Sequence, residues 1–502
     1  MDLLLLILGL FLSWGLLRAL LYLANRGKPS MVGVLPPGPR PFPVIGNLLE
    51  LGDQPHQSLT KLAKTYGPIM RLKLGSMTTM VITSPPLARE IIQTHDILFS
   101  NRLIPDTITA HRRDEFGLSW MPMSPLWKDQ RRICNMHLFG NKILDSNQDL
   151  RRRQVQGLLA HVRKCSESGA LVNLGEVIFT ASLNLLANAM LSIDLADPTS
   201  ETAKKFKAVV WQIMVAEGTP NMADYFPMLK KIDPQGAKRS NTDCITHMFD
   251  VFDRVIDKRL QDRKVPGAVR KNDLLDVLLD LSEDDSKDTS IFHIKHLFLD
   301  LLVAGTEATA STMEWAMAEL LHCPEKLVKV QAELELVIGR DNPIKESDVA
   351  RLPYLQAMVK ETYRMHPPLP LVPRMAGANV QVSGYTIPEG AQILVNVWAI
   401  GKDPTLWKNP DKFIPERFLG LDIDVKGQNF ELLPFGGGRR ICPALPLASR
   451  MIHLMLGSLL NSFDWKLEDG ISPDTMDMGE NYGLTLRRAQ SLLAVPLPIK
   501  KQ

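Results

Sequence analysis

Residues 435–444 read FGGGRRICPA and place one cysteine, Cys442, in a loop with three consecutive glycines. Those glycines let the backbone take turns that are closed to residues with a Cβ, so the loop can pass close to a flat ligand. A helix is predicted over 444–460, and the amides at its start, with the two arginines ahead of Cys442, favour a thiolate. Such a thiolate is the axial ligand that haem iron needs for O–O cleavage, and the Arg440 guanidinium suits a haem propionate. The alternative is a glycine-rich loop around a buried structural cysteine.

The pattern F-x-x-G-x-R-x-C is formed here by Phe435, Gly438, Arg440 and Cys442. It resembles the haem-binding loop of the cytochrome P450 superfamily of haem-thiolate monooxygenases. The resemblance implies a mainly α fold with small β-sheets, a haem b cofactor and Cys442 as the ligand of its iron. One residue departs from the family pattern. The glycine that is usual two places after the cysteine is Ala444, which should only tighten the packing under the haem.

Length and composition narrow the class of protein. The chain has 502 residues, of which 45% are hydrophobic, and a net charge of +3, which is too weakly basic for a nucleic-acid binder. Its five cysteines include no C-x-x-C pair, which argues against a disulfide framework or a zinc site and for a reducing compartment. Since the sequence contains no G-x-G-x-x-G or Walker A loop, electrons, if the reaction needs them, must come from another protein. The resemblance implies that this partner is NADPH-cytochrome P450 reductase.

The N-terminal residues 3–24 are nearly all apolar. About 20 apolar residues span a bilayer core. Arg26 and Lys28 follow the segment whereas only Asp2 precedes it, so the positive-inside rule places the rest of the chain in the cytosol. A cleaved secretory signal is the alternative, but the segment is too long and lacks a positive start and an A-x-A site. We predict a single-pass anchor, which the resemblance places in the endoplasmic reticulum membrane.

A proline-rich segment, PPGPRPFP at 36–43, follows the apolar run and predicts a stiff, extended spacer. Membrane-bound members of the superfamily carry a proline-rich hinge at this place. Beyond it we find no second linker and no internal repeat. The predicted organisation is a membrane anchor at 1–25, a hinge at 26–47 and a haem-thiolate catalytic domain at 48–502.

The catalytic domain has mostly helical periodicity, with a few short strands. Residues 292–323 contain no proline and predict one helix about 48 Å long. Acidic residues along this helix exclude a second membrane span. The polar stretch at 264–288 is interpreted as a surface loop with one helical turn. Two strand pairs are predicted, which are 71–74 with 79–83 around Gly75, and 380–385 with 392–397.

The long predicted helix carries the sequence AGTEAT at 304–309. A helix that crosses a haem face needs a small residue where oxygen binds, together with an acid and hydroxyls that relay protons. Family members show A/G-G-x-D/E-T-T/S here, so the resemblance makes Glu307, Ala308 and Thr309 the candidate catalytic positions. Ala308 stands where the family has threonine, so a substrate hydroxyl, a water or Thr309 would have to supply the missing hydroxyl. The alternative is a kinked helix with satisfied threonines.

Two further motifs match positions at which the family binds haem propionates. Trp127 and Arg131 lie at i,i+4 in LWKDQRRIC and match the W-x-x-x-R helix, whose indole N–H and guanidinium meet a propionate. Arg374 stands where the family often has another propionate ligand. A lone Trp/Arg pair would otherwise be packing. The resemblance therefore implies this cofactor-binding set: Trp127, Arg131, Arg374, Phe435, Gly438, Arg440 and Cys442.

Glu361 and Arg364 form an i,i+3 pair that matches the family's E-x-x-R helix, and Arg417 lies in its later P-E-R-F segment. An isolated pair of this kind is usually a solvated bridge of little value. Few polar residues surround this one. The resemblance implies a buried network that fixes the fold on the cysteine side, so we assign these residues to structure and not to catalysis.

The segments that the resemblance places around the substrate are mainly apolar or small. They are the loop 101–123, the long helix at 301–309, residues 369–372 and the turn 483–485. Such a pocket favours an oily substrate held by shape. The charged run at 112–115 is interpreted as a solvated loop tip. The predicted pocket residues are Leu301, Ala304, Leu369, Leu371, Val372 and Leu484.

Finer stretches, such as GDQPHQSL from Gly52 and NSFDWKLE from Asn461, resemble plant terpenoid-modifying members. The geraniol hydroxylase group is most similar, the ferruginol synthase group is near it, and betalain-pathway tyrosine hydroxylases are also similar. The resemblance implies a monooxygenase that uses dioxygen and reductase-delivered electrons to hydroxylate a small apolar metabolite, a monoterpenol or diterpenoid. The alternatives are a phenolic or alkaloid substrate, a reductase-independent isomerase or dehydratase, to which Ala308 gives some weight, and a non-catalytic, membrane-anchored haem-binding or interaction protein.

Overall fold

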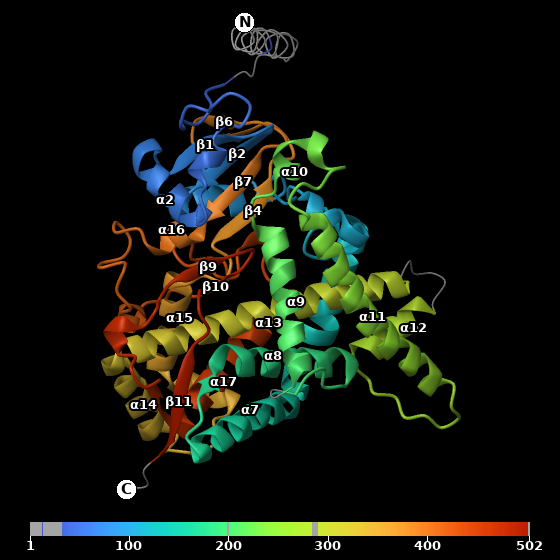
Figure 1. The fold of residues 1–502 in the computed structure, drawn as a ribbon, viewed down its shortest axis with the longest axis vertical. Coiled ribbons are helices and arrows are strands. Elements are labelled where there is room, and N and C mark those ends of the chain that lie inside the picture. Colours follow the sequence, from blue (N-terminus) through green and yellow to red (C-terminus); the bar gives the residue numbers. More distant parts are fainter. Residues whose placement is uncertain (1–12, 14–32, 198–199, 284–289, 500–502) are drawn as a thin grey trace, which may run out of the picture.

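The computed structural model describes residues 13, 33–197, 200–283 and 290–499, and the elements below belong to these residues. The chain is mainly helical with small β-sheets, as predicted. Figure 1 shows one long helix, α13, crossing the middle of the molecule, with β1, β2, β7 and β4 gathered towards one end. The helices are α2 (Pro55–Tyr66), α3 (Pro85–Arg89), α4 (Arg113–Phe116), α5 (Pro125–Cys134), α6 (Asn141–Ser146), α7 (Gln148–Ser168), α8 (Leu174–Leu191), α9 (Glu201–Gly218), α10 (Met222–Tyr225), α11 (Ala237–Arg263), α12 (Leu274–Ser282), α13 (Ile291–His322), α14 (Pro324–Val337), α15 (Pro353–Met365), α16 (Val397–Gly401) and α17 (Leu445–Ser462).

The strands of the described residues form one four-stranded sheet, in the order β1-β2-β7-β4, and three smaller sheets. β1 pairs antiparallel with β2 around Gly75, as predicted. The second predicted pair is wrong, because β5 pairs with β6 through the two-residue turn Ser383-Gly384, both at positive φ. β7 instead lies parallel to β2 and antiparallel to β4. The strands are β1 (Ile69–Leu74), β2 (Met77–Ile82), β3 (Val172–Asn173), β4 (Leu371–Met375), β5 (Val380–Val382), β6 (Tyr385–Ile387), β7 (Gln392–Asn396), β8 (Phe463–Leu467), β9 (Glu480–Tyr482), β10 (Leu486–Arg488) and β11 (Leu493–Pro498).

Helix α13 spans 32 residues and confirms the long helix predicted at 292–323. Its first turn is capped by Ser290 together with His293. Most of its side chains are buried, because α8, α9, α15 and α17 pack around it. Gly305 permits the close contact with α8, since a Cβ at this position would lie 2.6 Å from the Leu186 side chain. The core therefore fixes α13 along its length.

In the described part of the chain, α8 alone is long and apolar enough to cross a bilayer, and 83% of that span is buried inside the protein. α8 is therefore a core helix. The predicted anchor at 1–25 lies outside the described residues, except for Ser13. The later part of the predicted hinge lies against the sheets: the carbonyl of Pro37 accepts from the Arg71 N–H at 2.7 Å, and that of Val34 from the Thr386 N–H at 2.8 Å.

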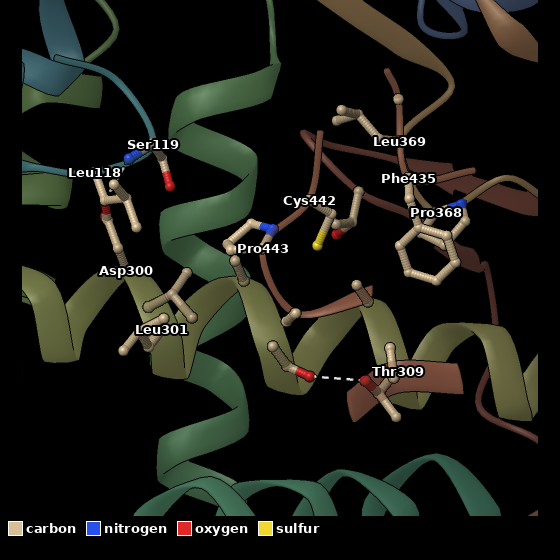
Figure 2. Close-up of a pocket in the computed structure, with 18 of the residues that line it drawn as sticks. Leu118, Ser119, Asp300, Leu301, Thr309, Pro368, Leu369, Phe435, Cys442 and Pro443 are labelled. Atoms are coloured by element: carbon tan, nitrogen blue, oxygen red, sulfur yellow. Dashed lines mark hydrogen bonds between the residues drawn. The ribbon is translucent and has the colours of Figure 1, made fainter. Parts of the chain in front are cut away.

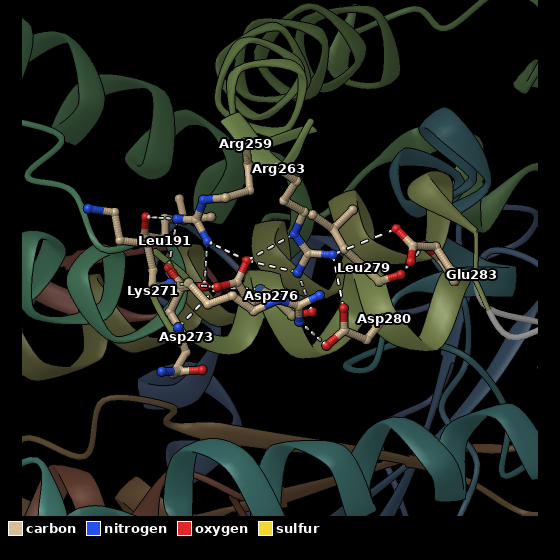
Figure 3. Close-up of polar contacts among 12 residues, drawn as sticks. Leu191, Arg259, Arg263, Lys271, Asp273, Asp276, Leu279, Asp280 and Glu283 are labelled. Atoms are coloured by element: carbon tan, nitrogen blue, oxygen red, sulfur yellow. Dashed lines mark hydrogen bonds and ion pairs between the residues drawn. The ribbon is translucent and has the colours of Figure 1, made fainter. Parts of the chain in front are cut away.

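The polar stretch at 264–288 contains more helix than predicted. Arg259 donates to both carboxylate oxygens of Asp273 at 2.8 Å, and Arg263 donates to Asp276 at 2.8 Å (Figure 3). These ion pairs hold α12 against α11. The interpretation as a loop with one helical turn is wrong, because the nine-residue helix α12 also buries an apolar face formed by Leu274, Leu275, Leu278 and Leu279.

The predicted Glu361–Arg364–Arg417 network is confirmed at the end of α15. Arg364 donates to both oxygens of Glu361 at 2.7 and 2.8 Å, and Arg417 donates to the same carboxylate at 3.0 Å. The Glu361 and Arg364 side chains are both 0% exposed. Arg364 also donates to the carbonyls of Gly401 and Pro410, so the network ties α15 to the end of α16 and to the segment that follows it.

Candidate active site

A cavity of about 300 Å³, within the size range of small-molecule sites, lies between α13 and the loop that carries Cys442. Figure 2 shows Cys442 and Pro443 facing α13, with Pro368, Leu369 and Phe435 at one end of the view. Ala304 is exposed although it lies in the middle of a buried helix, because it faces this cavity. The lining includes these predicted pocket residues: Leu301, Ala304, Leu369, Val372 and Leu484.

Leu371 does not line the cavity, so its predicted place in the pocket is wrong. Successive side chains of a strand point to opposite faces. In β4, Val372 faces the cavity, whereas Leu371 packs into a separate apolar cluster with Leu72 and Val81. The sequence identified the correct segment, but it gave no register for it.

Cys442 is the one cysteine of five, all of which the structure describes, that lines the cavity. Its N–H donates to the Phe435 carbonyl at 3.0 Å, which closes the loop just before α17 begins. Burial raises the pKa of the thiol, whereas hydrogen bonds from the backbone of Ala444 and Leu445 and the charge of Arg131 lower it. The helix N-terminus thus favours the thiolate, as predicted, and a bound metal cation would complete its deprotonation.

The two arginines ahead of Cys442 do not act on the sulfur as predicted. Arg439 turns to the surface and pairs with Asp96 at 3.1 Å. Arg440 is buried and donates to the carbonyls of Ser100 and Met121 at 2.8 and 2.6 Å. The cations whose charge favours the thiolate are instead those of Arg131 and Arg102.

Three of the arginines that line the cavity are Arg374 and Arg440, which are buried, and Arg102, which is partly buried. None of them forms an ion pair with a carboxylate of the described residues. Burial lowers the pKa of Arg102 to about 10 and the pKa values of Arg374 and Arg440 to about 9. Nε of Arg102 and Nη1 of Arg440 are buried without a hydrogen-bond partner. Cations that form no ion pair within the protein fit a ligand that brings carboxylates, as haem does.

Trp127 and Arg131 lie beside this cluster but contact the backbone. The Trp127 indole N–H donates to the Leu118 carbonyl at 3.2 Å, and Arg131 donates to the Ile441 carbonyl at 2.7 Å. The Arg440 guanidinium lies 4.7 Å from the centre of the Trp127 ring. Both side chains therefore fix the position of the loop at Cys442, and their predicted contacts with a propionate stay a prediction.

Gly438 must be glycine for two reasons. Its φ is +63°, and a Cβ would lie 2.3 Å from the Ile92 carbonyl oxygen. Ala444, the departure from the family pattern, has φ −88°, which any residue adopts. Phe435 lines the cavity and packs edge-on against Tyr363, with ring centres 5.4 Å apart. The loop thus keeps glycine where the backbone requires it.

The predicted catalytic positions on α13 divide between two faces. Ala308 and Thr309 line the cavity, together with Thr312 one turn later. The Thr309 hydroxyl donates to the Gly305 carbonyl at 2.8 Å, and that of Thr312 to the Ala308 carbonyl at 2.9 Å. Glu307 does not line the cavity. Burial raises its pKa, Arg487 and Lys207 oppose this shift, and its Oε2 is buried without a partner.

The sequence model of the family described as Cytochrome P450 matches residues 36–493. The chain belongs to the cytochrome P450 family. It is 50% identical over 497 residues to a geraniol 8-hydroxylase from Catharanthus roseus, covering 99% of each chain. A drimenol monooxygenase from Persicaria hydropiper is 48% identical over 481 residues, covering 96% of this P450 and 95% of the relative. A 7-ethoxycoumarin O-deethylase from Helianthus tuberosus is 45% identical over 500 residues, covering 99% of this P450 and 100% of the relative.

Family membership confirms the predicted enzyme class and cofactor. The chain is a cytochrome P450 monooxygenase, and its family binds haem through a cysteine thiolate. P450 monooxygenases depend on a redox partner, which agrees with the absence of a nucleotide-binding loop from the sequence.

The cavity of this P450 has a charged end that the sequence did not predict. Arg113, in the run 112–115 that was interpreted as a solvated tip, is buried and pairs with Glu217 and Asp300. Only Arg112 and Glu115 of that run are exposed and pair with each other. The interpretation is wrong for Arg113, because its partners lie in α9 and α13, far away in sequence. Arg102 lies within the loop 101–123 that was predicted to line the pocket, although no role was given to it, and sequence reasoning missed these lining residues: Glu217, Asp300 and Thr312.

Proposed function

We propose that this P450 is a membrane-anchored monooxygenase that hydroxylates a small terpenoid, with a geraniol-like monoterpenol ahead of a diterpenoid. The observation that carries the proposal is the mainly apolar cavity between α13 and the Cys442 loop, which suits an oily substrate. Similarity to enzymes named for geraniol and drimenol, both terpenoid alcohols, supports the substrate class.

Cys442 would supply the thiolate that ligates the haem iron, and Arg102, Arg374 and Arg440 would bind the haem propionates. The unpartnered guanidinium atoms of this cluster support the assignment. When bound, the haem supplies the activation of dioxygen and the transfer of one oxygen atom to a C–H bond. The protein holds the loop, supplies counter-charges and excludes bulk water with its apolar lining.

Proton delivery in this site has to proceed without a hydroxyl at position 308. The cavity-lining hydroxyls on α13 are Oγ1 of Thr309 and Oγ1 of Thr312, each donating to a carbonyl one turn back. We propose that Thr309 holds the proton-relaying group, a water or the substrate hydroxyl, in place of the missing side chain. Glu307 has a pKa that is raised by burial but does not line the cavity, so a proton from it would reach the cavity only through an intervening group.

We expect Ala308→Thr to lower the hydrogen peroxide released per NADPH consumed by roughly two- to tenfold, without abolishing product formation. The reason is that the new hydroxyl adds a proton donor on the face that lines the cavity. Ala308→Val is the matched control, because valine has the shape of threonine without the hydroxyl. Equal peroxide release by the parent and the threonine variant would mean that position 308 has no part in proton delivery.

The predicted localisation is the cytosolic face of the endoplasmic reticulum, with residues 1–25 as a single-pass anchor. Electrons would come from NADPH-cytochrome P450 reductase on the same membrane. The apolar N-terminal sequence, followed by Arg26 and Lys28, supports this arrangement. It agrees with the need of P450 monooxygenases for a redox partner.

The experiment that tests the proposal is a screen of microsomes that contain this P450 and the reductase. Monoterpene alcohols, abietane-type diterpenes and simple phenolics are offered, and products are identified by mass spectrometry. We expect an oxygenated terpenoid that disappears when the reductase or NADPH is omitted. Turnover of phenolics alone would contradict the terpenoid assignment, and a product that forms without reductase would contradict the monooxygenase chemistry.

A phenolic substrate is the second candidate, supported by the similarity to the 7-ethoxycoumarin O-deethylase. Trp120 in the cavity lining offers an aromatic side chain to a flat aromatic ring. The same screen separates the two classes, because each compound is offered alone and at matched concentration.

A further inference from the structure

Three charged side chains from three different elements meet at one end of the cavity. They are Arg113 of α4, Glu217 at the end of α9, and Asp300 of α13, and each side chain is 2% exposed. Arg113 donates to Glu217, and to Asp300 at 2.8 Å. The remaining carboxylate oxygens accept from the Trp120 indole at 3.1 Å and from the Ser119 N–H at 2.7 Å.

This cluster of Arg113, Glu217 and Asp300 retains unused hydrogen-bonding capacity beside a small-molecule cavity. Nε of Arg113 is buried without a partner. Each oxygen of Glu217 and Asp300 accepts one side-chain or backbone hydrogen bond, although a carboxylate oxygen can accept two. All three residues line the cavity. An alcohol can both donate and accept a hydrogen bond. It therefore matches the carboxylate oxygens of Glu217 and Asp300 and the free N–H of Arg113.

The position of the cluster sets the geometry of binding. Asp300 precedes Ala304 and Ala308 on α13 by about 6 and 12 Å of helix rise. Figure 2 shows Asp300 with Leu118 and Ser119 at one end of the cavity, Thr309 towards the other end, and Cys442 between them. An acyclic monoterpenol has about this length, so a hydroxyl at Asp300 places the opposite end of its chain beside Ala308.

We propose that Glu217 and Asp300, held in place by Arg113, bind the hydroxyl group of the substrate, so that this P450 oxidises a carbon remote from that hydroxyl. The inference rests on the proposed terpenoid-alcohol function and specifies how that substrate is oriented. The inference also places the substrate hydroxyl at the end of the cavity away from Ala308. A water held by Thr309 would then relay protons near Ala308. If the cluster had a purely structural role, its ion pairs would only hold α4, α9 and α13 together.

The test compares geraniol with its methyl ether, which lacks the donor, by titrating the haem absorption change of the full-length holoenzyme. We expect the wild type to bind the alcohol about tenfold or more tightly than the ether, as for one hydrogen bond to a charged group. In Glu217→Gln and in Asp300→Asn, each measured separately, this preference should fall below about threefold. The matched control is Glu314→Gln, a buried carboxylate of α13 that accepts from the Leu492 N–H at 2.7 Å and does not line the cavity.

The possible results of this experiment distinguish the inference about Glu217 and Asp300 from the proposed terpenoid function. Loss of the preference in the two cavity variants, with the preference retained in Glu314→Gln, supports the inference. An unchanged preference in haem-loaded Glu217→Gln and Asp300→Asn, or equal binding of the two compounds by the wild type, overturns it and leaves the proposed function intact. Binding of neither compound by the wild type would overturn the terpenoid assignment and this inference with it.

Discussion

Replacing Cys442 by alanine is expected to remove the red-shifted absorption band of the ferrous carbon-monoxide complex and to reduce turnover below detection. Cys442 lines the cavity at the N-terminus of α17, where the backbone of Ala444 and Leu445 favours its thiolate. Without the sulfur, the protein offers no other thiolate to a haem in this cavity, since the other four cysteines lie outside its lining. The measurement is the difference spectrum of purified variant with its haem content matched to the wild type.

Cys134→Ala is the matched control for this prediction. Cys134 is also buried, and burial raises the pKa of its thiol to about 12, so it stays protonated at neutral pH. We expect this variant to keep the red-shifted band and most of the activity. Retention of the band by Cys442→Ala would contradict the assignment of the axial ligand.

Glu361→Gln is expected to lower the free energy of unfolding by about 3–5 kcal/mol and to reduce the retention of haem. The substitution keeps the size of the side chain but leaves Arg364, which is fully buried, and Arg417 without their common counter-charge. The network ties α15 to the end of α16 and to the segment that follows it, so its loss should loosen the side of the fold that carries the Cys442 loop. Urea unfolding followed by circular dichroism, with haem absorbance in parallel, measures both effects.

The control for Glu361→Gln is an exposed pair with the same spacing. Arg132 and Asp129 also form an i,i+3 ion pair, at 2.9 Å, but their side chains are 66% and 57% exposed. We expect Asp129→Asn to change the free energy of unfolding by less than about 0.5 kcal/mol, because solvent screens such pairs. Similar changes in the free energy of unfolding for the two substitutions would show that burial of the network does not contribute to stability.

The sequence predicted the parts of the fold that depend on local patterns. The long helix was expected at 292–323 and α13 is Ile291–His322, because an uninterrupted, proline-free stretch determines a helix from its own residues. The partner of β7 was missed for the opposite reason. Alternation identifies a strand, but it does not identify which strand lies beside it, and β2 and β7 are separated by more than half of the chain.

The same distinction applies to the candidate site. Motif residues such as Cys442 and Arg440 could be placed from spacing and resemblance. The charged end of the cavity could not, because Arg113 finds Glu217 and Asp300 at separations of 104 and 187 residues. A charged run in a loop is usually solvated, and only the tertiary contacts show that Arg113 is the exception. The predicted place of Leu371 in the pocket was wrong for a similar reason, because the register of β4 decides which side chains face the cavity.

The most direct test of the proposed chemistry is an incubation of this P450 and its reductase with geraniol, NADPH and isotopically labelled dioxygen. The account predicts a product that carries one labelled oxygen atom, at a carbon remote from the original hydroxyl, as located by mass spectrometry and NMR. A product without the label would contradict the monooxygenase chemistry. A labelled product oxidised at the hydroxyl-bearing carbon would contradict the orientation set by Glu217 and Asp300.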